Sequence, residues 1–80
     1  MTSSLHKYYK KHFDGLLILV QLNPTELTGI ELVVNEEGQV IRTEREFDED
    51  IYEDLAVDEF LEASPLEFNL YLKGLAGTSN

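Results

Sequence analysis

The residues best able to do chemistry lie between positions 44 and 64, where ten acidic side chains share the stretch with one arginine. Four of its carboxylates occupy positions 1, 3, 7 and 12 of a twelve-residue window, as calcium ligands do in a binding loop: Asp48, Asp50, Asp54 and Glu59. The rest of the window does not fit. Position 6 requires glycine for a sharp turn and has Glu53, and position 5 requires an oxygen ligand and has Tyr52. We therefore expect no metal site and interpret these carboxylates as the solvated face of a helix.

The other side chains with catalytic potential are scattered. His6 and His12 are six residues apart, which puts them about 240° apart on a helix, so they cannot bind one ion together. Asp14 and the nearby tyrosines do not combine with His12 into a nucleophile, a base and an orienting group. The chain has no cysteine and no glycine-rich phosphate loop. We expect no catalytic residues, no cofactor and no enzyme activity.

Composition bounds the class of protein. The chain has 80 residues, of which 42% are hydrophobic, and a net charge of -10. Residues 1–22 carry a net +2 and residues 23–80 a net -12. No apolar run is long enough to span a membrane, and the lack of cysteine fits a reducing compartment. We expect one cytoplasmic domain over residues 1–76, followed by a disordered tail at 77–80.

Apolar periodicity predicts the elements of the first half. Large side chains at helical spacing predict an amphipathic helix over residues 3–13, ending at Asp14 and Gly15. The nearly continuous apolar run at 15–22 predicts a central strand. Alternating side chains at 30–35 predict a second strand, and residues 40–47 continue as a third strand without a clear register, after a hairpin that contains Gly38.

The second half contains a conflict between two signals. An acidic first turn and an apolar stripe predict a helix over 48–63, with a possible bend near Ala56. Ser64, Pro65 and Glu67 then match a helix-capping pattern, whereas the apolar residues of 66–73 alternate as in a strand. We favour the strand, and a helix is the alternative.

Together these elements predict an α+β fold in the order α-β-β-β-α-β. The three middle strands form an antiparallel meander, and the second helix returns the chain so that the last strand lies beside the first. This predicts a four-stranded, mostly antiparallel sheet in the spatial order 4-1-2-3, with both helices packed on one face.

Such a fold leaves the other face of the sheet without cover. The side chains expected there are Leu17, Leu19, Val33 and Tyr71. Because a monomer seldom exposes a contiguous patch of large apolar groups, the leading hypothesis is an interface for a second copy or for another protein. The protein would then be a non-catalytic interaction module of unknown process. If the first helix crosses to that face instead, the patch is core.

The acidic helix suggests an alternative function. Asp50, Glu53, Asp54 and Asp58 could imitate the phosphates of a nucleic acid and occupy a basic groove on a partner protein. Direct binding to nucleic acid is disfavoured, because phosphates would meet a body with a net charge of -12. The order α-β-β-β-α is similar to that of double-stranded-RNA-binding domains, but the second helix here is acidic, so that function is not carried over.

Overall fold

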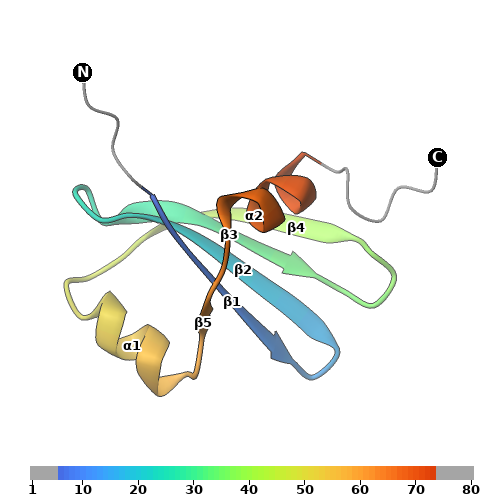
Figure 1. Ribbon diagram of the computed structural model, residues 1–80, viewed down its shortest axis with the longest axis horizontal. Helices are drawn as coiled ribbons and strands as arrows, with labels where there is room; N and C mark the ends of the chain where they lie inside the picture. Colours follow the sequence, from blue (N-terminus) through green and yellow to red (C-terminus); the bar gives the residue numbers. More distant parts are fainter. Residues whose placement is uncertain (1–5, 74–80) are drawn as a thin grey trace.

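The computed structural model describes residues 6–73, which form five strands and two helices (Figure 1). In chain order these are β1 (Lys7–Phe13), β2 (Leu16–Asn23), β3 (Thr28–Val34), β4 (Val40–Glu46), α1 (Ile51–Val57), β5 (Leu61–Glu62) and α2 (Pro65–Leu72). The predicted α+β class, with two helices and an antiparallel sheet, is confirmed. The tail predicted at 77–80 lies outside the described residues.

The strands form one sheet in the order β4-β3-β2-β1-β5, and each neighbouring pair is antiparallel. The predicted meander is confirmed, since the segments 15–22, 30–35 and 40–47 correspond to β2, β3 and β4. The prediction of four strands in the order 4-1-2-3 is wrong, because residues 6–73 form a five-stranded sheet. β2 keeps the central position that its apolar run requires, but its outer neighbour is β1 and not the C-terminal segment.

The first segment is a strand over Lys7–Phe13, so the helix predicted over 3–13 is wrong for the residues that the structure describes. Tyr8 packs against the core beneath α2, whereas Tyr9 packs against the core beneath α1. Adjacent strand residues point to opposite faces, and aromatic side chains favour strands. Asp14 and Gly15 both have positive φ, at 57° and 80°. This is the backbone of a tight hairpin turn between β1 and β2, not of a helix end.

The helix predicted over 48–63 is shorter and is followed by a strand. α1 ends at Val57, and Glu59 turns the chain with a φ of 65°. Leu61 and Glu62 then pair with β1 as β5, and the Ala63 N–H donates to the Tyr8 carbonyl oxygen at 2.9 Å. The apolar residues beyond Val57 therefore do not continue the helix: Leu61 belongs to a sheet edge, and Phe60 packs against the core beneath α1.

The last element is a helix over Pro65–Leu72, so the strand predicted over 66–73 is wrong. The Ser64 hydroxyl accepts the Glu67 N–H at 3.0 Å, with Pro65 in the first turn. The local capping signal thus prevails over alternation. Phe68 is fully buried, while Leu66 is 69% exposed. An ion pair at 3.1 Å between Lys10 of β1 and Glu67 ties the start of this helix to the sheet.

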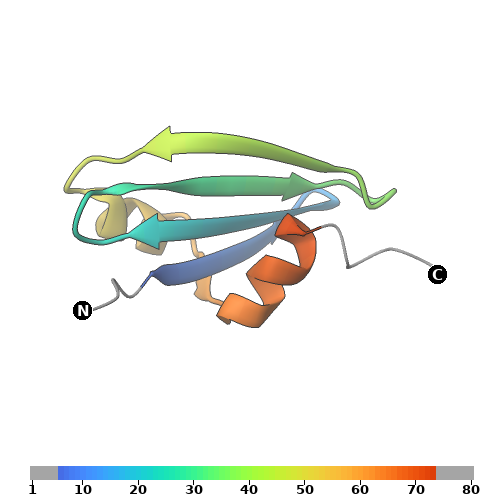
Figure 2. The ribbon, with the colours of Figure 1, turned by 90° about the horizontal axis from the view of Figure 1, so that it is seen from above.

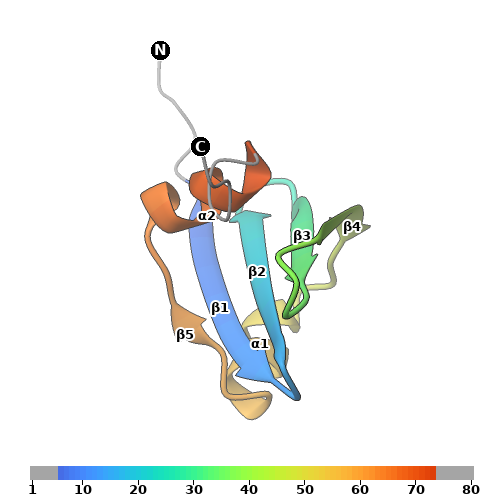
Figure 3. The ribbon, with the colours of Figure 1, turned by 90° about the vertical axis from the view of Figure 1, so that its right-hand side faces the viewer.

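The two helices lie on opposite faces of the sheet, so the prediction that both cover one face is wrong (Figure 2, Figure 3). α2 places Phe68 against Leu19, whereas α1 places Ile51 and Leu55 against Leu22. Leu19 and Leu22 belong to the same strand, three residues apart, and therefore point to opposite sides. Between the helices the chain pairs with the outer edge of β1, so it passes round that edge from one face to the other. We call these faces the α1 side and the α2 side.

Candidate functional site

The four residues of the predicted apolar interface do not share one exposed surface. Leu19 is fully buried, and Leu17 and Tyr71 pack around the same core on the α2 side. Val33 lies on the α1 side, because it pairs with Ile18 of β2. The expected exposed patch at Leu17 and Leu19 is therefore corrected: α2 covers that part of the sheet, because residues 65–72 fold as a helix and not as a fourth strand.

An apolar surface does remain, on the other side of the sheet. The register places Ile18, Val33 and Ile41 in one row across three strands, with Phe13 and Leu16 paired beside them. Phe13 is 58% exposed and Ile41 65%, and the other three are half-buried. We call these five residues the uncovered face. Sequence reasoning missed it because it assigned this side of β2 to the helices, although the alternation of β2 already divided its residues into two sets.

Charged groups border the uncovered face. Lys11 stands in the same row as Ile18, and its ammonium group lies 5.3 Å from the ring centroid of Phe13 and 5.9 Å from that of Phe60. It therefore lies between the uncovered face and the part of the sheet that α1 covers. At the hairpin end, Asp14 and Glu36 lie beside Leu16 in a shallow hollow. The rim thus carries one ammonium group near α1 and is acidic at the hairpins.

The four acidic residues of the alternative hypothesis all lie at or within α1. Asp50, Glu53, Asp54 and Asp58 are exposed. Asp54 and Asp58 line a groove between α1 and the sheet, which Arg45 of β4 also lines. Arg45 forms an ion pair with Glu31 of β3 at 2.9 Å.

The calcium-like window contains α1, so its backbone is helical where a binding loop would have to turn. Within residues 6–73, no three histidine, aspartate or glutamate side chains are grouped so as to hold a metal ion.

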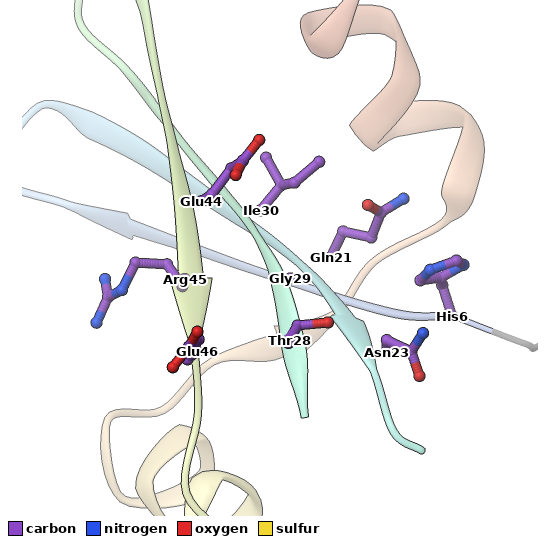
Figure 4. A pocket seen from close by; sticks show the side chains of 9 residues that line it. All are labelled: His6, Gln21, Asn23, Thr28, Gly29, Ile30, Glu44, Arg45 and Glu46. Atoms are coloured by element: carbon purple, nitrogen blue, oxygen red, sulfur yellow. The ribbon is translucent and has the colours of Figure 1, made fainter. Parts of the chain in front are cut away.

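A polar hollow lies on the α2 side, where the sheet extends beyond α2 (Figure 4). Gln21, Thr28, Ile30 and Glu44 contribute to its lining from three strands, and Figure 4 shows Arg45 pointing away from them. The Gln21 amide donates to the Tyr8 hydroxyl at 3.1 Å. The hollow offers hydrogen-bonding groups to water or to a polar ligand, but its residues do not form a nucleophile paired with a base.

Among the described residues, Tyr9 is the one whose pKa departs clearly from its ordinary value. Its pKa is raised above the ordinary value of 10.0, first because the ring is partly buried under α1, and further because Tyr52 and Glu62 lie nearby. A phenol with a raised pKa stays neutral at physiological pH. Its hydroxyl therefore reports on the packing of α1 and is not activated for chemistry.

Comparisons of the chain with models of known families, with curated proteins and with solved structures find no match. Within residues 6–73, neither helix has the length and apolar composition required to cross a membrane. The cytoplasmic location stays a prediction. The surfaces of residues 6–73 are therefore the basis for proposing a function.

Proposed function

We propose that the protein is a non-catalytic interaction module that binds a partner protein through the uncovered face. The observation that carries this proposal is the row of Ile18, Val33 and Ile41, which continues to Leu16 and Phe13 without a helix over it. Contiguous apolar patches of this kind mark interaction sites on soluble proteins. Fully burying one large apolar side chain stabilises a complex by about 1.5 to 3 kcal/mol, so several together supply a useful affinity.

The rim of the uncovered face and the net charge define the chemistry of the partner. The chain carries a net charge of -10, and Asp14 and Glu36 lie at the hairpin end of the face. A partner with apolar side chains flanked by lysine or arginine satisfies both features, since opposite charge speeds encounter and suppresses wrong partners. The interaction site therefore suits a basic protein that presents an apolar patch.

A catalytic role is not part of the proposal. Among the hydrogen bonds of residues 6–73, none joins a hydroxyl group to a histidine, so the arrangement that activates a nucleophile is not seen there.

The test compares two pairs of exposed apolar residues. Phe13→Ser with Ile41→Ser changes the uncovered face, and Val57→Ser with Leu66→Ser is the matched control, because its residues are 78% and 69% exposed but lie elsewhere. Each exposed substitution is expected to change the free energy of unfolding by no more than about 0.5 kcal/mol. Proteins captured by the wild type and the control, and identified by mass spectrometry, should be lost with the first pair. Equal capture by all three proteins would contradict the proposal.

The acidic mimic is the second candidate, because the structure exposes all four carboxylates at or within one helix. Ile51 and Leu55 anchor that helix to the sheet, so the spacing of the carboxylates is held firmly. Changing Asp50, Glu53 and Asp54 to their amides would weaken binding to a basic groove, as would added salt. The Phe13→Ser/Ile41→Ser variant would bind normally in that case, which separates the two functions.

A further inference from the structure

The outer edge of β4 carries backbone groups that no described strand uses. The Phe47 N–H donates to the Leu27 carbonyl at 2.8 Å, and the Asn35 N–H donates to the Gln39 carbonyl at 3.0 Å. In an antiparallel ladder, every second residue bonds to the same neighbour. With this register, residues 41, 43 and 45 bond to β3, so the N–H and C=O groups of 40, 42, 44 and 46 point outward. Within residues 6–73, no strand lies beside them.

The charge of β4 differs from that of the rest of the acidic body. Residues 23–80 contain fifteen acidic residues and only three basic ones, and two of the three, Arg42 and Arg45, are in β4. They balance Glu44 and Glu46 of the same strand. Copies that each carry a net charge of -10 repel one another over most of their surface. β4 is a neutral edge along which two of them can approach.

We propose that two copies of the chain pair antiparallel along β4, about a two-fold axis at Thr43, and form one continuous ten-stranded sheet. Thr43 is the central residue of β4, so the axis lets all seven residues of Val40–Glu46 pair with their counterparts. Arg42 then stands opposite Glu44 of the second copy, and Glu44 stands opposite Arg42 of the second copy. Opposite charges directly across a strand pair are favourable.

The same residues favour this register over its neighbours. Only residues whose backbone groups both point outward can form a hydrogen-bonded pair, so the register slips in steps of two residues. One such slip sets Arg42 against its own counterpart and pairs no opposite charges. The opposite slip pairs Arg42 with Glu46 of the second copy but sets Glu44 against its own counterpart, whereas the proposed register has no like-charge pair. Like charges directly opposite one another are unfavourable. Arg42 and Glu44 already lie 3.5 Å apart on the α2 side, so in the proposed register four charges alternate in sign around the axis.

The pairing does not depend on the proposed function, because it uses backbone groups and the α2-side charges of β4. It does have a consequence for that function. A two-fold axis through the sheet keeps the α1 sides of both copies on the same side of the joint sheet. A dimer would therefore present two uncovered faces in one direction, which permits bivalent binding.

Cross-linking tests the axis directly, because the chain has no cysteine of its own. In the proposed register, Thr43 forms a non-hydrogen-bonded pair with its counterpart, with about 4.5 Å between the Cα atoms, which suits a disulfide. Ile41→Cys is the matched control, since residue 41 on the two copies would be separated by about 13 Å along the strand. We expect mild oxidation to convert Thr43→Cys into a covalent dimer and to leave Ile41→Cys monomeric. The proposal would be overturned if both variants cross-link equally, or if neither variant cross-links.

Charge exchange tests the register by sedimentation over a concentration series. Arg42→Glu sets two carboxylates against each other twice per dimer and should raise the dimer dissociation constant about tenfold or more. The double variant Arg42→Glu/Glu44→Arg restores opposite charges and should recover dimerisation. Glu44→Pro should abolish it, because it removes an outward N–H and leaves the bonds to β3 intact. A wild type that stays monomeric, or a double variant no better than Arg42→Glu, would refute this pairing. Neither result bears on capture through the uncovered face, because the charge exchange leaves Phe13 and Ile41 unchanged.

Discussion

On the α2 side of the sheet, Leu19, Leu32 and Phe68 have no exposed surface, whereas on the α1 side Phe13 and Ile41 are more than half exposed. Helix length alone does not account for the difference. α1 has seven residues and α2 eight, which correspond to about 10 and 12 Å. A seven-residue strand extends for about 23 Å, so each helix leaves part of its face without cover.

The two uncovered parts differ in chemistry. Where the sheet extends beyond α2, Gln21, Thr28 and Glu44 surround a polar hollow that water can fill. Where it extends beyond α1, the row of Ile18, Val33 and Ile41 is apolar. A polar end is stable in water, whereas an apolar end is stabilised when another surface binds to it and removes it from water. The apolar part beyond α1 is therefore the candidate binding surface, and the polar part beyond α2 is a solvated end of the sheet.

A substitution in the closed core of the α2 side should cause the largest loss of stability. Phe68→Ala removes a fully buried ring that packs against Leu19, Leu32 and Val34. We expect the free energy of unfolding to fall by about 3 to 5 kcal/mol, which is much of the stability of a small domain. Urea denaturation followed by circular dichroism measures this loss. If the alanine variant does not fold, the milder substitution Phe68→Leu is measured instead. A loss below about 1 kcal/mol for Phe68→Ala would show that α2 does not pack tightly against the sheet.

A substitution in the half-closed core of the α1 side should lower the free energy of unfolding by less. Leu55→Ala removes a buried side chain that packs, with Ile51, against Leu22. Leu55 keeps 7% of its surface exposed and lies at the edge of an open region, so we expect a cost near the lower end for a leucine, about 2 kcal/mol. The same urea experiment makes the comparison. If Leu55→Ala lowers the free energy of unfolding as much as Phe68→Ala does, the two sides of the sheet are closed equally.

Much of the fold could be predicted where one signal stood alone. The meander of β2, β3 and β4 is indicated by an apolar run, by an alternating strand and by the hairpin at Gly38, and its prediction is confirmed. The residues of β1 do not predict a strand, because its aromatic side chains are shared between two cores and neither face shows clean alternation. The pair Asp14-Gly15 was the better signal, since it is typical of a hairpin turn between two strands. For α2, the capping residues Ser64 and Pro65 carried the correct information.

The candidate surface could not be predicted, because it depends on where short helices end. Alternation in β2 divides Leu17 and Leu19 from Leu16 and Ile18, but it does not say which set a helix will cover. The two-residue strand β5 decides this, since it carries the chain from the α1 side to the α2 side. No periodic pattern is readable in so short a segment.

The residues that precede the two helices should also differ in how much they contribute to stability. The Ser64 hydroxyl accepts the Glu67 N–H at 3.0 Å, whereas Asp50 makes no such bond at the start of α1. Ser64→Ala should therefore lower the free energy of unfolding by about 1 kcal/mol. Asp50→Ala should lower it less, because it loses only an electrostatic contribution. Denaturation midpoints of the two variants measure the difference, and equal shifts would mean that the Ser64 bond contributes nothing particular.

The smallest effect should appear only in alkaline solution and should report on the α1 side alone. Burial under α1, with Tyr52 and Glu62 nearby, raises the pKa of Tyr9 above 10.0 in the folded protein. The unfolded chain therefore loses the Tyr9 proton first as the pH rises. Stability from this group is complete below about pH 10 and declines as the pH rises from there through the folded pKa. In Tyr9→Phe this part of the alkaline decline should be missing, as seen by comparing denaturation curves near neutral pH and above pH 10. A difference between wild type and variant that stays constant over this range would show that α1 does not bury the phenol, and that the α1 side is more open than its packing indicates.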